Sequence, residues 1–146
     1  MTRSDKLNIA KIYIDRLTML DSKGIQDIVD DGFLWHFTGP SLDLPDLHGK
    51  DGVKAMVESI APGWEPGNLK MNITHEAVDG DHVVIEADVH GTMKDGRRYE
   101  NVYLMWFEIS GGLVRSFRET ADTKVIFDVL INPGKISPES AGEIYE

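Results

Sequence analysis

The sequence of 146 residues predicts a single α+β domain in which helices come first and a run of antiparallel strands follows. Two observations lead to this fold class. Between residues 5 and 60 most apolar residues recur at helical spacings of three and four, whereas from Leu69 to Ala121 they alternate with a period of two. A long twisted sheet curls around the helices that cover it, so we expect a conical space open at one end.

Three helices are predicted in the first part of the chain. The first spans residues 5–20, and its apolar stripe consists of Ile9, Ala10, Tyr13, Leu17 and Leu20. The second is shorter; it follows a cap at Asp21 and ends at Asp31-Gly32. The third spans residues 50–60 and ends at a Pro- and Gly-rich loop, in which Trp64 is expected to be exposed.

Strands are predicted over residues 33–38, where aromatic residues alternate, and over four longer segments between residues 69 and 121. Turns at Asp79-Gly80, Asp95-Gly96 and Gly111-Gly112 divide these four segments into an antiparallel meander. A short helix is expected around residues 125–130. The domain is therefore placed at residues 1–132, and residues 133–146 are predicted to be a loose tail.

Composition excludes several classes of function. The chain has no cysteine, which excludes disulfides and thiolate chemistry and agrees with a cytoplasmic location. It shows no secretion signal, and no apolar run approaches the length that crosses a membrane. A net charge of −10 with dispersed Lys and Arg disfavours nucleic acid as a partner. No phosphate-binding loop or serine elbow is present, so no cofactor is expected.

The predicted strand register decides which side chains face the cavity. A two-residue loop at Asp95-Gly96 pairs His90 with Asn101 and Asp88 with Tyr103. One sheet face then holds Glu86, Asp88, His90, Tyr99, Asn101 and Tyr103. The other face holds Ile85, Ala87, Val89, Val102, Leu104 and Trp106. We expect the polar face to line the cavity and the apolar face to be covered by a second sheet or a second subunit, most simply in a homodimer.

The last hairpin leaves two registers open. A two-residue loop would place Glu119 on the apolar face, whereas a three-residue loop, Ser110-Gly111-Gly112, places it opposite Tyr103. The second register is expected because it avoids burying an unpaired carboxylate among apolar side chains. A one-residue error at this hairpin would overturn the list of residues that face the cavity.

The stretch from Gly91 to Thr123 resembles the C-terminal strands of SnoaL-like proteins of the NTF2-like superfamily. The matching features are Gly91, Asp95-Gly96, Tyr99-Glu100-Asn101-x-Tyr103, Gly111-Gly112, Arg118-Glu119 and Asp122. The resemblance extends over about residues 5–130. It implies an NTF2-like cone, a curved antiparallel sheet packed on three N-terminal helices. Relatives include polyketide cyclases, ketosteroid isomerases, limonene-epoxide hydrolases and phenazine-biosynthesis proteins.

The resemblance also implies site residues. In the phenazine-biosynthesis relatives the matching tyrosine and glutamate, here Tyr99 and Glu119, line the ligand cavity. The epoxide hydrolases use an Arg-x-Asp pair where this chain has Glu86-x-Asp88-x-His90, so epoxide hydrolysis is disfavoured. A metal held by that triplet is not expected, because the family usually works without metal and no paired histidine motif is present.

These residues predict proton transfer on a small hydrophobic carbonyl compound, which gives cyclisation, isomerisation or dehydration. Glu119 and Asp88 are the candidate general acid/base residues, and His90 is a candidate proton shuttle. The predicted lining of the substrate site is Tyr13, Trp35, Tyr99, Asn101, Tyr103 and Phe117. The alternatives are a non-catalytic ligand-binding or accessory module with the same cavity, and a dimerisation domain with an incidental one. For single residues the alternatives are an ion pair for Glu119, a structural role for His90 and ordinary core packing for the aromatic residues.

Overall fold

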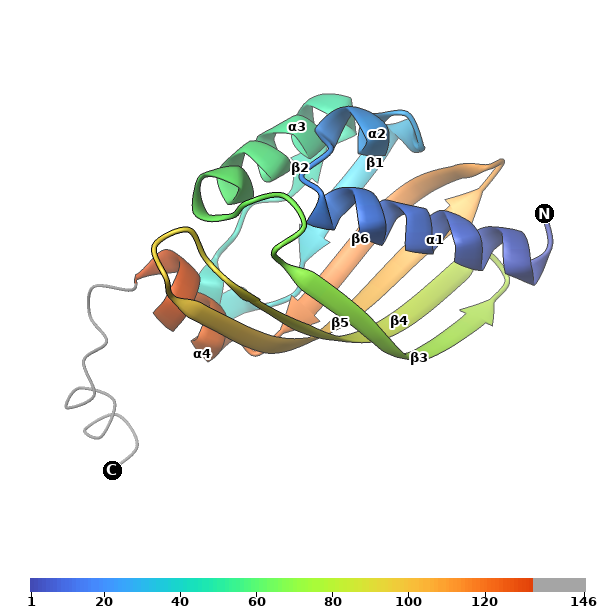
Figure 1. Ribbon diagram of the computed structural model, residues 1–146. Coiled ribbons are helices and arrows are strands. Elements are labelled where there is room, and N and C mark those ends of the chain that lie inside the picture. The colour runs from blue at the N-terminus through green and yellow to red at the C-terminus, as the bar shows by residue number, and fades with distance from the viewer. Residues whose placement is uncertain (133–146) are drawn as a thin grey trace.

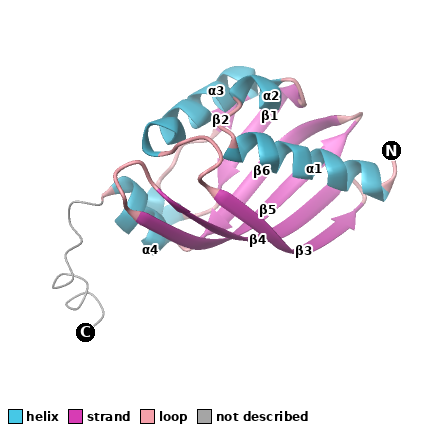
Figure 2. Ribbon diagram, viewed as in Figure 1, coloured by secondary structure: helices cyan, strands magenta, loops and turns pink. Residues whose placement is uncertain are grey.

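The computed structural model describes residues 1–132, and the predicted tail, residues 133–146, lies outside the described residues. The α+β prediction is confirmed: a curved sheet of six strands in the order β2-β1-β6-β5-β4-β3 is covered on one side by helices (Figures 1 and 2). The elements are α1 (Arg3–Thr18), α2 (Ser22–Gln26), β1 (Val29–Phe37), η1 (Pro40–Leu42), β2 (Leu47–His48), α3 (Gly49–Ile60), η2 (Ala61–Gly63), β3 (Lys70–Asp79), β4 (His82–Thr92), β5 (Arg98–Ser110), β6 (Leu113–Ala121), α4 (Thr123–Val125) and η3 (Ile126–Ile131).

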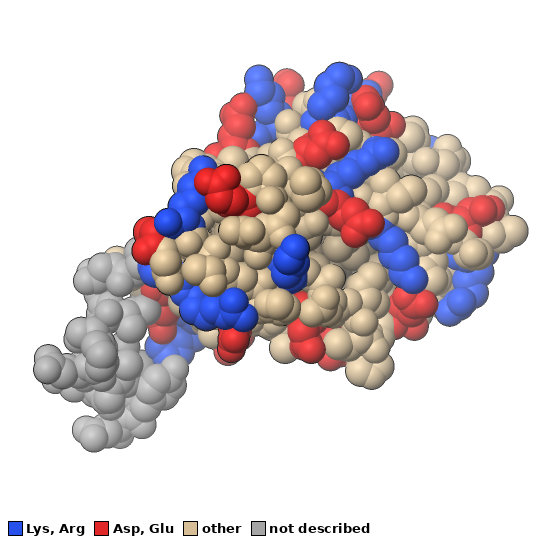
Figure 3. Space-filling view, viewed as in Figure 1, with Lys and Arg blue, Asp and Glu red and all other residues tan. Residues whose placement is uncertain are grey.

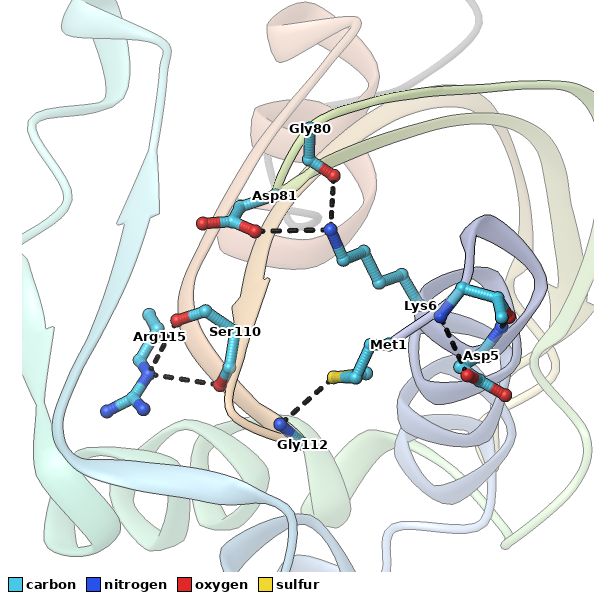
Figure 4. Close-up of polar contacts among 9 residues, drawn as sticks. Met1, Asp5, Lys6, Gly80, Asp81, Ser110, Gly112 and Arg115 are labelled. Atoms are coloured by element: carbon cyan, nitrogen blue, oxygen red, sulfur yellow. Dashed lines mark hydrogen bonds and ion pairs between the residues drawn. The ribbon is translucent and has the colours of Figure 1, made fainter.

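Helix α1 lies across the inner face of the sheet and is fixed at its N-terminal end. Thr2 and Asp5 form a capping box, which satisfies backbone N–H groups of the first turn. The Lys6 Nζ donates to the carbonyl oxygen of Gly80 at 2.7 Å and contacts the carboxylate of Asp81 at 3.1 Å. The helix is thereby attached to the turn between β3 and β4 (Figure 4).

The predicted second helix was wrong at its C-terminal end. Helix α2 ends at Gln26, and Val29 already belongs to β1, where it is buried and aligned with Val114 of β6. A β-branched residue buried in a sheet is stabilised by its neighbours there, and this packing decides against continuing the helix. Strand β1 runs parallel to β6, so the sheet is mixed, while β3 to β6 form the predicted antiparallel meander.

The predicted register of the β4–β5 hairpin was wrong by one residue. Met93 and Arg97 close a three-residue loop in which Gly96 has a φ of 90°, so Val89 pairs with Asn101 and Ala87 pairs with Tyr103. In this type of three-residue loop a tight turn is followed by a residue in the left-handed conformation, here the glycine of the Asp-Gly pair. An Asp-Gly pair is compatible with this loop and with a two-residue turn, so the sequence does not distinguish the two. Because side chains alternate along a strand, this slip exchanges the two faces of β4 relative to β5.

As a result, Glu86, Asp88 and His90 lie on the outer face of the sheet, together with Val102, Leu104 and Trp106. Ile85, Ala87 and Val89 lie on the inner face, together with Tyr99 and Tyr103. The predicted face composition was therefore wrong for β4 and correct for the tyrosines of β5.

The β5–β6 hairpin also differs from the expected loop. Its turn has two residues, Gly111 and Gly112, both with positive φ, and a register shift in the strands next to it leaves Arg115 without a pairing partner. Arg115 is held there by an ion pair with Asp30 at 2.6 Å. The bulge restores the alternation that a two-residue loop alone would have reversed. Glu119 consequently pairs with Met105 instead of Tyr103, but it lies on the inner face, as predicted.

Charged side chains of both signs are interspersed on the visible face of the molecule (Figure 3). Among residues 1–132 there is no cluster of three or more His, Asp or Glu side chains arranged to hold a metal ion. No helix in this part of the chain has the length and apolar character needed to cross a membrane.

Candidate active site

A cavity of about 140 Å³ lies between the inner face of the sheet, α3 and η3. Its walls are almost entirely apolar, and three polar side chains reach it: Glu119 from β6 and the two tyrosines Tyr99 and Tyr103 from β5. The full lining is Leu17, Trp35, Phe37, Leu44, Met56, Ile60, Trp64, Leu69, Met71, Tyr99, Tyr103, Glu119, Ile126 and Leu130. An enclosed apolar space with a few convergent polar groups is the usual form of a small-molecule site.

Glu119 is positioned by the parallel pairing of β1 with β6. Its alignment with Phe37 brings the neighbouring inner-face residue of β1, Trp35, close enough to donate its indole N–H to Oε1 of Glu119 at 3.3 Å. Burial disfavours the charged carboxylate and raises the pKa of Glu119 from its ordinary value of 4.5 to about 7, although the Trp35 hydrogen bond opposes this effect. No ion pair of Glu119 is found among the described residues. A carboxyl group with such a pKa exchanges protons readily at neutral pH.

The two tyrosines form a hydrogen-bonded pair in the cavity wall. Their hydroxyl oxygens are 2.6 Å apart, and the amide nitrogen of Asn101 lies 2.9 Å from the hydroxyl of Tyr99. Burial raises the pKa of Tyr103 well above its usual range and also raises that of Tyr99. Both side chains therefore keep their protons at neutral pH and can act as hydrogen-bond donors.

Trp64 lines the cavity, and the prediction that it is exposed was wrong. Only 3% of its surface is accessible, and its ring packs edge-on against Tyr99 with 6.1 Å between ring centroids. Gly91 of β4 makes this possible, because a Cβ at that position would lie 2.4 Å from the carbonyl oxygen of Asn68 and 2.8 Å from the Trp64 ring. A glycine inside a strand often marks such a close approach, so Gly91 was the signal for this contact in the sequence.

One end of the cavity is covered by the C-terminal elements of the described chain. Ile126 and Leu130 of η3 line it, and the Arg97 guanidinium donates to the carbonyl oxygen of Val129. Arg97 belongs to the β4–β5 loop, so this contact joins the loop to η3, and both lie at the same end of the sheet (Figure 1). Sequence reasoning missed these residues because single apolar positions in a short terminal helix carry no signal for a cavity.

The predicted site residues fall into three groups. Trp35, Tyr99, Tyr103 and Glu119 line the cavity, and Asn101 contacts it through Tyr99. Tyr13 and Phe117 were expected to line it but lie in the aromatic core with 4.8 Å between their ring centroids. The Tyr13 hydroxyl is buried and has no hydrogen-bond partner among residues 1–132; burial, with a smaller contribution from the charge of Glu119, raises its pKa well above the usual range.

Asp88 and His90 form the third group, and their predicted place beside Glu119 was wrong. The register of β4 puts both on the outer face, where they border an open groove of about 590 Å³ together with Glu100 and Asp122. His90 contacts Asn72 and Arg98 there. We assign the site to the smaller inner cavity because an enclosed carboxyl group with a raised pKa meets hydrogen-bond donors there.

A cone-shaped α+β fold around such a cavity defines a class of proteins that bind small ligands. Within that class, a family model for the SnoaL-like domain matches residues 10–117, and the chain belongs to this family. The NTF2-like architecture predicted from the sequence is thereby confirmed. No curated protein matches the chain.

Solved structures agree with this assignment. PrhC from Penicillium brasilianum is similar with a TM-score of 0.79 and 19% identity, over 97% of this chain and 94% of the other. A protein described as a SnoaL-like polyketide cyclase, from Jannaschia sp. CCS1, has a TM-score of 0.74 and 16% identity, over 89% and 94%. A Catenulispora acidiphila protein with a ketosteroid isomerase-like fold, bound to trimethylamine, has a TM-score of 0.65 and 15% identity, over 76% and 82%. At these identities the similarity shows the fold alone.

Proposed function

We propose that this protein is a cofactor-independent enzyme that transfers protons on a small hydrophobic carbonyl compound, with Glu119 as the general base and acid. The observation behind this proposal is the carboxyl group of Glu119, enclosed in an apolar cavity and holding a pKa of about 7. A base of this strength is half ionised near neutral pH, where general acid/base catalysis is most effective. The polyketide cyclase among the structural relatives supports the same class of substrate.

The reaction follows from the groups that line the cavity. The ionised carboxylate of Glu119 takes a proton from the carbon next to the carbonyl group, and the C–H electron pair moves to form an enolate. A tyrosine hydroxyl donates a hydrogen bond to the enolate oxygen and stabilises its charge. Glu119, now protonated, returns the proton to the same carbon or to another one. Return to another carbon is isomerisation. In cyclisation the enolate carbon attacks a second carbonyl group, and the Glu119 proton goes to the alkoxide that forms. In dehydration the enolate expels a neighbouring hydroxyl group, which takes the Glu119 proton and leaves as water.

Hydrogen–deuterium exchange tests the first step without knowledge of the natural substrate. We expect the protein to accelerate exchange at the carbons next to the carbonyl of cyclohexanone in D₂O, followed by NMR. The rate should rise with pH and level off above about pH 7, because only ionised Glu119 acts as the base. A ketone that binds in the cavity without any acceleration of exchange would instead favour the non-catalytic ligand-binding module.

A homodimer is the second part of the proposal, and it rests on the outer face of the sheet. Val102, Leu104 and Trp106 are each about half exposed there, at 47–49%. Acidic residues such as Glu86 and the basic Arg118 lie on the same face. In a two-fold symmetric dimer, acidic residues of one copy can therefore form ion pairs with Arg118 of the other copy. A second copy of the chain is therefore the occupant we propose for this face.

Replacing Trp106 with glutamate should weaken the dimer by about tenfold or more, because it puts a charge into the apolar patch. Sedimentation velocity over a range of protein concentrations measures the change. Ile12→Glu on α1 is the matched control, since Ile12 is also exposed but lies on a helix away from this face. A wild-type chain that remains monomeric at high concentration would contradict the proposal.

A further inference from the structure

The side chain of Asn101 has only one orientation that satisfies its neighbours. Its Oδ1 lies 2.8 Å from the backbone nitrogen of Val102 and 3.0 Å from that of Asp122, and both are donors. Its Nδ2 lies 3.1 Å from the carbonyl oxygen of Asp122 and 2.9 Å from the hydroxyl of Tyr99. A flipped amide would set Nδ2 against two N–H groups and Oδ1 against a carbonyl oxygen. The amide nitrogen therefore faces Tyr99 and donates to it.

This orientation fixes the direction of the hydrogen bond between the tyrosines. A hydroxyl group has one hydrogen to donate, and Tyr99 already accepts from Asn101. The Tyr99 oxygen can accept a second hydrogen bond, but hydrogen bonds that run in one direction along a chain strengthen one another, so across the 2.6 Å separation Tyr99 gives its own hydrogen to the hydroxyl oxygen of Tyr103. Tyr103 then accepts from Tyr99 and keeps its hydrogen for another partner. No further hydrogen bond of Tyr103 is found within residues 1–132, and its side chain lines the cavity.

We propose that Tyr103 is the residue that donates a hydrogen bond to the oxygen atom of the ligand, and that Asn101 is a positioning residue that directs this donor into the cavity. The inference rests on the proposed function and makes it more specific. The two tyrosines then have different roles. Tyr103 contacts the ligand oxygen, while Tyr99 accepts a hydrogen bond from Asn101 and donates one to Tyr103.

The same geometry specifies the ligand. No Lys, Arg or His is found among the described residues that line the cavity, and Glu119 would repel an anion when it is ionised. Carboxylates and phosphates are thus disfavoured. A cavity of about 150 Å³ with apolar walls holds one benzene molecule, which is close to the 140 Å³ found here. The ligand class is therefore a neutral compound of about one ring, with a carbonyl oxygen directed at Tyr103.

Binding of cyclohexanone and methylenecyclohexane tests this assignment, because the two compounds have nearly the same shape and only the ketone accepts a hydrogen bond. We expect the wild-type protein to bind the ketone about three- to tenfold more tightly and to lower its carbonyl stretching frequency in the infrared spectrum. Both effects should disappear in Tyr103→Phe and remain in Tyr99→Phe, where Tyr103 is still free to donate.

Asn101→Asp tests the positioning role, measured at about pH 8 so that the new carboxylate is ionised. A carboxylate only accepts, so Tyr99 would donate to it and Tyr103 would donate to Tyr99. The protein would keep its tyrosine pair yet lose the frequency shift, a change that a merely structural role of Asn101 does not produce. Should this variant not fold, the two phenylalanine variants decide the direction. With the opposite direction, Tyr99 would keep its hydrogen for the ligand, and Tyr103→Phe would retain both the preference for the ketone and the frequency shift.

The inference is overturned if the wild-type protein binds both compounds equally, if neither binds, or if Tyr103→Phe retains the frequency shift. Failure of the proposed function has a different signature. In that case the ketone preference and its dependence on Tyr103 are observed, but cyclohexanone shows no accelerated exchange.

Discussion

Replacing Glu119 with glutamine should lower the rate of ketone exchange by a factor on the order of 10²–10⁴, the usual contribution of a positioned general base. Glutamine has the shape of glutamate and can still accept the hydrogen bond from Trp35, but it cannot take up a proton. The loss should therefore appear in the rate and leave ketone binding within a few-fold of the wild-type value. Single-turnover exchange followed by NMR, with binding measured separately, distinguishes the two quantities.

Asp88→Asn is the matched control for this experiment. It also removes one carboxylate, but from the outer face of the sheet. We expect exchange to be unchanged in this variant, because the β4 register keeps Asp88 away from the cavity. A large loss in Asp88→Asn together with a small one in Glu119→Gln would contradict the assignment of the base.

Stability should depend on pH in a way that Glu119→Gln abolishes. In the unfolded chain Glu119 ionises above about pH 4.5, whereas in the folded protein it stays protonated until about pH 7. Between these values the folded state binds more protons than the unfolded state, so the free energy of unfolding falls as pH rises. The total effect is about 3 kcal/mol, fully developed above pH 7. The glutamine variant does not pay this cost, and it should therefore gain stability relative to wild type as pH rises.

Urea unfolding of both proteins at about pH 5 and about pH 8 measures this difference. Other titrating groups contribute equally to both proteins and cancel in the comparison. Glu58→Gln on α3 serves as the control, because this carboxylate is exposed and contacts Lys54, and its stability relative to wild type should change little over the same range. A difference between Glu119→Gln and wild type that is independent of pH would show that Glu119 has an ordinary pKa in the folded protein.

The candidate site was only partly predictable, and the reason lies in the two hairpins. The β4–β5 hairpin contains an Asp-Gly pair and the β5–β6 hairpin contains a glycine pair, and each pair is compatible with a loop of two or three residues. A change of one residue in the length of the loop moves the side chains of one strand to the opposite face of the sheet. At the β4–β5 hairpin the longer loop forms, which moved Asp88 and His90 to the outer face. At the β5–β6 hairpin the shorter loop forms, yet the bulge at Arg115 kept Glu119 inside. The face of Glu119 was predicted correctly, but the reason was wrong, because on the inner face the carboxyl group lies in an almost entirely apolar cavity and burial raises its pKa.

The fold class and the family could be predicted from the sequence, because periodicity, turn residues and the Gly91–Thr123 motifs are local properties of the chain. The alternation of side chains also predicts that Tyr99, Asn101 and Tyr103 share one face of their strand. The residues that lie opposite them depend on long-range packing. The parallel pairing of β1 with β6 brings Trp35 to Glu119, and the packing of Trp64 against Gly91 completes the cavity. These contacts join residues far apart in the chain, and their geometry depends on side-chain packing that no local pattern encodes.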